Sequence, residues 1–169
     1  HRDLHSFPTR RSSDLALDAN KRLEVLLDAA ARLTPPINVL LAGDGPCLEP
    51  LRQLAARLGL SGFHAPGRVA EGLPLYYRAA DVLVLPGRGG MVISEAMAHS
   101  LPVMVFQADG TEYDLVEDGA TGVRLQRGDA QEIAAALAAL RSDPQRARQM
   151  GRLGRSEEHT SELQSPNTI

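Results

Sequence analysis

The chain has 169 residues, enough for one domain with a buried core, and its apolar residues (43%) include few aromatic ones (4%). Aliphatic side chains must therefore build the interior, as they do in α/β domains with buried strands and Ala/Leu-rich helices. The formal net charge of -3 is spread along the chain without a basic block, which argues against nucleic acid or an anionic membrane as a partner. Cys47 is the single cysteine, so an internal disulfide is excluded.

The chain carries no sign of a membrane span, a leader or a metal site. No apolar run approaches the roughly 18 residues that cross a bilayer, and no secretory signal pattern opens the sequence. We therefore expect a cytoplasmic protein, which could associate with a membrane only through a part outside this chain. No closely spaced aspartate pair and no His/Cys cluster predicts a metal site. For His64 and His99 we favour packing or capping roles.

The two ends differ in character from the middle. Residues 1–15 and 155–169 are polar and show neither a helical nor a strand period, so their composition predicts disordered tails. Both segments also resemble in-frame translations of short sequencing adapters, one from each side of a library insert. We therefore exclude both tails from the domain, which we assign to residues 16–154.

Helices and strands are predicted to alternate along residues 16–154. Asp18 can cap the first helix, and Asp129 can cap the long Ala-rich one. Helices are expected at 21–33, 48–58, 73–80, 92–100, 131–142 and 145–152, the last one started by Asp143-Pro144. Strands are expected at 37–42, 81–86, 103–106 and 123–125, with a short one within 62–69. This alternation is the βαβ pattern, and right-handed crossovers then predict a doubly wound, Rossmann-like parallel sheet of the α/β class.

A glycine-rich loop follows the strand expected at 81–86. Gly87, Gly89 and Gly90 would let the backbone approach a ligand, and the next helix would point its free N–H groups and positive dipole end at the same space. The loop therefore predicts a phosphate or diphosphate site, with an ordinary turn as the alternative. Glu95 in that helix could accept hydrogen bonds from two vicinal hydroxyls, or could simply stabilise the helix dipole at the surface.

The same segments carry a family signature. The run PGRGGMVISEAMAHSLPV, followed by ADGTEYDLVEDGATG, resembles the donor site of the group 1 glycosyltransferases, glycosyltransferase family 4. The upstream runs LLAGDGPCLEPLRQLAARLGL and GRVAEGLPLYYRAADVLVLP match the family in the same order and at the expected separations. The resemblance spans 16–154. It implies the C-terminal, donor-binding half of a GT-B fold, which is made of two Rossmann-like domains.

The resemblance also implies roles for individual residues. Glu95 matches the glutamate that holds the donor ribose hydroxyls, and Gly89, Gly90 and Met91 match the loop whose backbone amides hold the diphosphate. Lys21 matches the catalytic lysine that pairs with the diphosphate and steadies the leaving nucleotide. From the pattern alone, Lys21 is an ordinary first-turn surface lysine.

Three further residues are assigned less directly to donor binding. Arg68 and Val69 match the loop beside the nucleotide base, although an arginine there is also typical of a solvated loop. Glu112 is assigned to the same cleft, with a capping or turn role left open.

Three positions depart from the family pattern. Gly87 stands where the family has an acid eight residues before Glu95 that contacts the donor sugar. Ala16 stands where the family has an arginine, and Ser100 replaces a glycine after the helix. Ser100 carries a mild penalty if its φ is positive.

The expected function is that of a retaining glycosyltransferase. It would transfer a sugar from a nucleoside diphosphate-sugar, with UDP or GDP favoured, to an unknown acceptor, and it would need no cofactor. The acceptor-binding N-terminal domain is missing, so this chain alone is expected to bind donor without turnover. Gly87 and Ala16 motivate the alternative of a non-catalytic nucleotide-binding module. A nicotinamide dehydrogenase is disfavoured, because Gly43-Asp44-Gly45 is followed by Leu48 where that fingerprint needs glycine.

Overall fold

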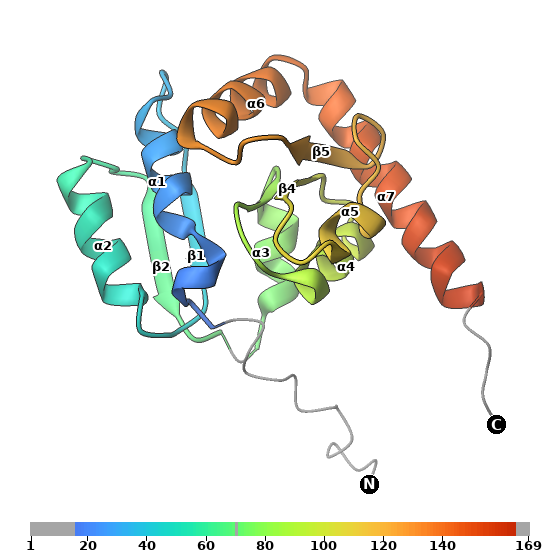
Figure 1. Cartoon of the computed structure of the whole chain (residues 1–169), viewed down its shortest axis with the longest axis horizontal. Helices are drawn as coiled ribbons and strands as arrows, with labels where there is room; N and C mark the ends of the chain where they lie inside the picture. Colours follow the sequence, from blue (N-terminus) through green and yellow to red (C-terminus); the bar gives the residue numbers. More distant parts are fainter. Residues whose placement is uncertain (1–15, 70, 165–169) are drawn as a thin grey trace, which may run out of the picture.

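The computed structural model describes residues 16–69 and 71–164, in which helices and strands alternate (Figure 1). The first half contains the 3-10 helix η1 (Ala19–Lys21), α1 (Leu23–Ala31), β1 (Val39–Ala42), α2 (Leu48–Arg57), β2 (Phe63–Gly67) and α3 (Leu73–Ala79). The second half contains β3 (Leu83–Leu85), α4 (Gly90–Ala98), β4 (Val103–Phe106), α5 (Thr111–Leu115), β5 (Gly122–Leu125), α6 (Ala130–Ser142) and α7 (Pro144–Gln164). None of the described helices is both long and apolar enough to cross a membrane.

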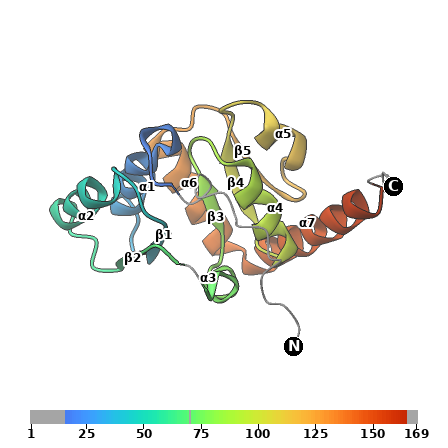
Figure 2. The ribbon, with the colours of Figure 1, turned by 90° about the horizontal axis from the view of Figure 1, so that it is seen from below.

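All strand pairs are parallel, which confirms the expected α/β class. The strands nevertheless form two hydrogen-bonded sheets, a two-stranded one of order β1-β2 and a three-stranded one of order β3-β4-β5. Figure 2 shows the two sheets beside one another. Within the described ranges, the edge of β1 away from β2 carries one parallel bridge, between Ala16 and Asp44 just beyond the strand. In the same ranges, no strand pairs with the edge of β3 away from β4.

Helix α1 packs against both sheets. Leu27 and Ala30 lie in a buried cluster with Leu41 of β1. Ala29 of the same helix lies in a second cluster with Met104 of β4 and with residues of β5 and α6. Apolar burial against one shared helix therefore holds the two sheets together on this face.

The other face of the three-stranded sheet is covered by α3 and α4. Tyr77 of α3 and Ile93 and Met97 of α4 form a third cluster with Val103 and Val105 of β4. Helices thus lie on both faces of the strands, as a doubly wound domain requires. The three clusters are built largely from Leu, Ile, Val, Met and Ala, as the low aromatic content predicted.

The first helix begins later than predicted. Asp18 does act as a cap, but its side chain accepts a hydrogen bond from the Asn20 N–H at 2.9 Å and so caps η1. Arg22 then adopts a left-handed conformation with φ 52°, and α1 begins at Leu23. The prediction that Lys21 is a first-turn surface lysine was wrong, because η1 turns this residue inward and leaves it 8% exposed.

The C-terminal helix is longer than predicted. We expected no regular structure after Gly154, whereas α7 continues to Gln164. A helix already begun extends at little cost through residues such as Glu, Leu and Gln. Among the residues up to 159, Gly154 is the last buried one and lies beside Met97, and 155–159 contribute no buried side chain. The domain boundary at 154 stays a prediction, and the predicted tail 1–15 lies outside the described residues.

Helix α6 begins with the predicted cap. The side chain of Asp129 accepts a hydrogen bond from the Glu132 N–H at 2.8 Å. The Glu132 carboxylate in turn accepts the backbone N–H groups of Gln126, Arg127 and Gly128 at 2.7–2.8 Å. Partial burial raises the pKa of Glu132, but these three bonds to the ionised form outweigh it, so the pKa of Glu132 lies below its ordinary value.

This cap predicts a contribution to stability that depends on pH. Since folding lowers the pKa of Glu132, its carboxylate stabilises the fold above the ordinary value of 4.5 and loses that effect as the pH falls through the lower folded pKa. Glu132→Gln should therefore lower the free energy of unfolding at pH 7, and the difference between its stability and that of the parent chain should shrink as the pH falls below 4.5. Urea unfolding at several pH values measures both curves. A difference that grows as the pH falls would contradict the assignment.

The shared helix α1 gives a second prediction. Leu27 is 1% exposed between α1, β1 and α2, so Leu27→Ala should lower the free energy of unfolding by about 2–5 kcal/mol. Leu75→Ala is the matched control, because Leu75 is a helical leucine that is 64% exposed. Its effect should stay within about 0.5 kcal/mol. Equal losses for the two variants, measured by urea unfolding, would refute the packing described here.

Candidate functional site

The candidate site lies where the parallel strands end. The segments after β1, β2, β3 and β4 all leave the carboxyl edge of the sheets, where open α/β sheets bind ligands. The predicted glycine loop follows β3 and leads into α4, which begins at Gly90. The first N–H groups of α4 therefore face this edge with the positive end of the helix dipole.

Lys21 lies beside this loop. Its Nζ atom is 3.9 Å from the point that a Cβ on Gly89 would occupy. The structure thus brings together the lysine and the glycine loop that the sequence assigned to one site from distant positions. Lys21 as a whole is only 8% exposed, so its side chain runs along the fold toward the loop.

The backbone before Lys21 lies directly on Gly87. A Cβ built on Gly87 would overlap the carbonyl oxygen of Asn20 and come within 2.8 Å of the carbonyl carbon of Lys21. The same Asn20 oxygen accepts a hydrogen bond from the Arg88 N–H at 3.0 Å. A side chain at position 87, including the acid of the family pattern, would therefore require η1 to move away from the loop.

Arg22 is a contributor that the sequence did not reveal. Its guanidinium donates to the carbonyl oxygens of Pro86 at 3.4 Å and Gly128 at 3.3 Å, and it lies over the ring of Phe106 at 5.2 Å. It therefore ties the start of α1 to the end of β3 and to the loop before α6. No spacing rule relates these segments, so only the fold could expose this contact.

Glu95 is a bonded, half-buried residue on the second turn of α4. Its Oε2 accepts a hydrogen bond from the Tyr77 hydroxyl at 3.0 Å. The Nδ1 atom of His99 lies 2.8 Å from the Glu95 carbonyl oxygen, and the rings of Tyr77 and His99 stack with centroids 5.1 Å apart. The packing and capping role favoured for His99 is confirmed, since it is the C-cap residue of α4. Glu95 is thus tied to neighbouring side chains, and the choice between a ribose contact and a dipole-stabilising role stays a prediction.

Glu112 is enclosed by the turn that precedes α5. It is 0% exposed, and its Oε2 accepts the backbone N–H groups of Ala108, Asp109 and Gly110 at 3.2–3.3 Å. Its Oε1 is buried and has no hydrogen-bond partner within residues 16–69 and 71–164. The turn role that the sequence left open is therefore present, while direct contact between Glu112 and a donor stays a prediction.

The turn held by Glu112 contacts the glycine loop. A Cβ on Gly90 would lie 3.4 Å from the Thr111 Cγ2 atom, and the Arg88 guanidinium lies 3.5 Å from an Asp109 carboxylate oxygen. Bonds to Thr111, followed by the Arg88 guanidinium, lower the pKa of Asp109. Both partners of this ion pair are largely exposed, so it adds little stability but marks where the two loops meet.

The remaining predicted residues also lie at this edge. Met91 is exposed in the first turn of α4. Arg68 is exposed just after β2, and Val69 packs against the cluster that contains Tyr77 and Leu85. Ser100, beyond the other end of α4, has a φ of 59°, so the conditional backbone penalty applies.

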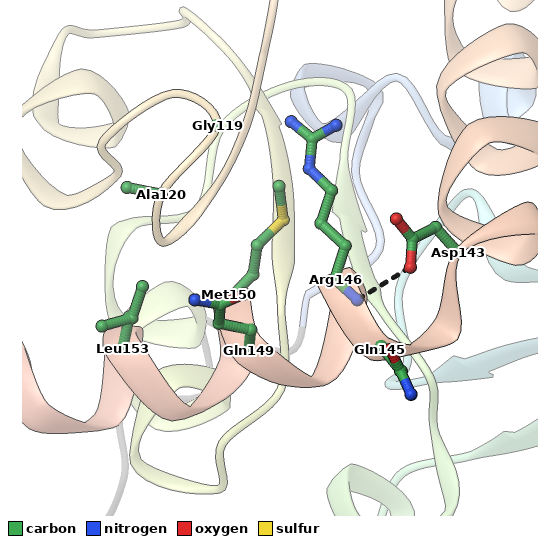
Figure 3. A pocket seen from close by; sticks show the side chains of 8 residues that line it. All are labelled: Gly119, Ala120, Asp143, Gln145, Arg146, Gln149, Met150 and Leu153. Carbon is green, nitrogen blue, oxygen red and sulfur yellow. Dashed lines mark hydrogen bonds between the residues drawn. The ribbon is translucent and has the colours of Figure 1, made fainter.

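Two surface cavities lie elsewhere. One of about 390 Å³ lies between α7 and the loop at Gly119 and Ala120, where Arg146 extends toward that loop (Figure 3). The other, of about 500 Å³, lies between β1, β2 and α3. Neither is lined by a residue of the predicted site. We place the candidate site at the glycine loop, because the converging N–H groups and the buried lysine suit an anion better than an open, mainly solvated hollow does.

The family assignment follows from sequence comparison. The family described as Glycosyl transferases group 1 matches residues 14–143, which include the Lys21 segment, the glycine loop and Glu95. The chain belongs to the group 1 glycosyltransferase family.

Curated relatives agree with this assignment. A GDP-mannose-dependent alpha-(1-6)-phosphatidylinositol monomannoside mannosyltransferase of Mycolicibacterium smegmatis is 35% identical over 136 residues, 73% of this chain and 35% of the relative. A D-inositol 3-phosphate glycosyltransferase of Nocardia farcinica is 35% identical over 147 residues, 78% of this chain and 32% of the relative. The chain therefore spans about a third of the length of these relatives.

Solved structures share the fold of this chain. The structure of Anabaena Alr3699/HepE in complex with UDP and glucose matches with a TM-score of 0.77 and 26% identity, covering 87% of this chain and 44% of that one. The C-terminal domain of a group 1 glycosyltransferase, LpcC from Francisella tularensis, matches with a TM-score of 0.75 and 23% identity, covering 89% of this chain and 84% of that one. The fold is thus that of the C-terminal domain, as the sequence resemblance implied.

The contact between Gly87 and Asn20 is testable. Because a Cβ at position 87 would meet fixed backbone atoms, Gly87→Ala should lower the free energy of unfolding by about 1–3 kcal/mol. Gly90→Ala is the control in the same loop, since its Cβ would meet only the Thr111 side chain at ordinary contact distance and alanine favours the helix. Thermal and urea unfolding would measure both variants. A Gly87→Ala chain as stable as the parent would show that η1 does not lie on this loop.

Proposed function

We propose that this chain is the donor-binding half of a retaining glycosyltransferase that uses a nucleoside diphosphate-sugar, with UDP or GDP as the nucleotide. The observation that carries the proposal is the position of Lys21, whose ammonium group lies against Gly89 at the start of α4. A buried cation and a helix N-terminus together suit a diphosphate, and they would stabilise the negative charge that develops when the nucleotide leaves.

The other site residues fit the same ligand. The amides of Gly89, Gly90 and Met91 would hold diphosphate oxygens, while Glu95, further along α4, would accept the hydroxyls of the ribose. Arg68 and Val69 would lie beside the base. Relatives support this direction, since one is named as GDP-mannose-dependent and a structural neighbour was solved with UDP. In the whole enzyme, a preceding domain would bind the acceptor.

A second candidate is a nucleotide-binding module without catalysis. It is favoured by Gly87, because the backbone of Asn20 occupies the space that the family's acidic side chain needs. The two candidates share the nucleotide site and differ in turnover. Sugar transfer by a protein that includes the preceding half would support the first, and tight donor binding without transfer would support the second.

Nucleotide binding is the direct test. Titration of the chain with UDP, GDP and ADP by calorimetry should give binding for at least one of them, and that ligand at about a hundred times its Kd should stabilise the fold by roughly 2.7 kcal/mol. Lys21→Met keeps an apolar side chain and removes the charge, so it should weaken nucleoside diphosphate binding about tenfold or more, with a smaller effect on the monophosphate.

Arg57→Met is the matched control, because it removes one exposed positive charge from the end of α2, away from the glycine loop. It should leave the affinity within about twofold. A folded chain that ignores all three nucleotides, or a Lys21→Met variant that binds as the parent does, would overturn the proposed site.

A further inference from the structure

Tyr77 places a hydrogen-bond donor beside Glu95 with little freedom to move. The residue is 8% exposed, and its ring lies in the apolar cluster that includes Ile93 and Leu85. The ring also stacks on His99 with an interplanar angle of 19°. A phenol ring fixed on both sides holds its hydroxyl in one position, from which it donates to Glu95 Oε2 at 3.0 Å.

The contact belongs to a small network of interactions between α3 and α4. Tyr77 bonds to the Glu95 carboxylate and stacks on His99, whose Nδ1 lies 2.8 Å from the Glu95 carbonyl oxygen. Both ends of Glu95, its side chain and its backbone, are therefore tied to the same aromatic pair. A glutamate on a helix surface otherwise samples several rotamers, and restricting it to one of them on ligand binding costs conformational entropy.

We infer that Tyr77 is the positioning residue for Glu95, fixing the orientation in which its carboxylate receives vicinal ribose hydroxyls and thereby favouring ribonucleotides over deoxyribonucleotides. This inference rests on the proposed function, in which Glu95 contacts the ribose. A carboxylate accepts two neighbouring hydroxyls best when its plane has the matching orientation. If that orientation is fixed before binding, the ribose hydroxyls add more to the affinity, and the affinity for a ribonucleotide exceeds that for a deoxyribonucleotide by more. Tyr77 itself does not contact the ligand.

The test compares a ribonucleotide with its counterpart lacking both ribose hydroxyls. Kd values would be measured by calorimetry for UDP and 2′,3′-dideoxy-UDP, and for GDP and 2′,3′-dideoxy-GDP. In the parent chain, the ribonucleotide should bind more tightly than its dideoxy counterpart. Tyr77→Phe removes only the hydroxyl and keeps the stacked ring, so it should reduce this preference about three- to tenfold and leave the dideoxy affinity unchanged.

Two further variants serve as a negative and a positive control. Tyr76→Phe removes a hydroxyl from the neighbouring, half-buried tyrosine of α3 and should leave the preference unchanged. Glu95→Gln should reduce the preference at least as much as Tyr77→Phe does, because it alters the group that meets the ribose. Melting curves of each variant check that the fold is retained.

Each outcome is decisive. If Glu95→Gln abolishes the preference and Tyr77→Phe does not change it, the positioning role is wrong and the proposed donor site stands. If Tyr77→Phe weakens both nucleotides equally, the hydroxyl acts on the fold and the positioning role is again wrong. If Glu95→Gln leaves the preference intact, or the parent chain has none, the ribose contact of the proposed function fails and the inference fails with it.

Discussion

The burial of α1 against both parallel sheets is the constraint on which the rest of the structure depends. Ala29 and Ala30 point to different sheets, and their small side chains let the helix lie close to the strands of each. The turn that precedes α1 is positioned by the same packing. Lys21 then faces the glycine loop, and the guanidinium of Arg22 reaches the ends of β3 and of the loop before α6. The packing of α1 in the core therefore also sets the positions of the residues at the candidate site.

The close approach at Gly87 gives the unusual residue of the signature a physical cause. The acid that the family resemblance leads us to expect at this position has no room, because the backbone of η1 lies against the loop without an intervening side chain. Lys21 lies beside the same loop and is only 8% exposed. The acid at 87 and the inward Lys21 segment compete for the same volume, so they are alternatives in this backbone conformation.

Local signals predicted the alternation of elements, because each rests on neighbouring residues. The apolar run before Pro86 indicated a strand, and Asp129 marked the start of α6. The failures share a different cause. The left-handed Arg22, the inward Lys21 and the bond between Tyr77 and Glu95 depend on contacts between segments distant in sequence. Periodicity carries no information about such contacts, and the family resemblance supplied roles without supplying the supporting residues.

The division of the strands into two sheets has a consequence for contacts with other molecules. Along one edge of β1 and one edge of β3, within residues 16–69 and 71–164, the backbone amides and carbonyls have no strand partner beyond the bridge from Ala16 to Asp44. Packing between the sheets nevertheless brings these two edges toward one another, since Ala42 of β1 lies against the cluster that contains Leu85 of β3, and Ile37, just before β1, shares a cluster with Val84 of β3. The strands that end the two sheets on the outside are β2 and β5. An extended segment of another molecule would therefore find its template at β2 or β5.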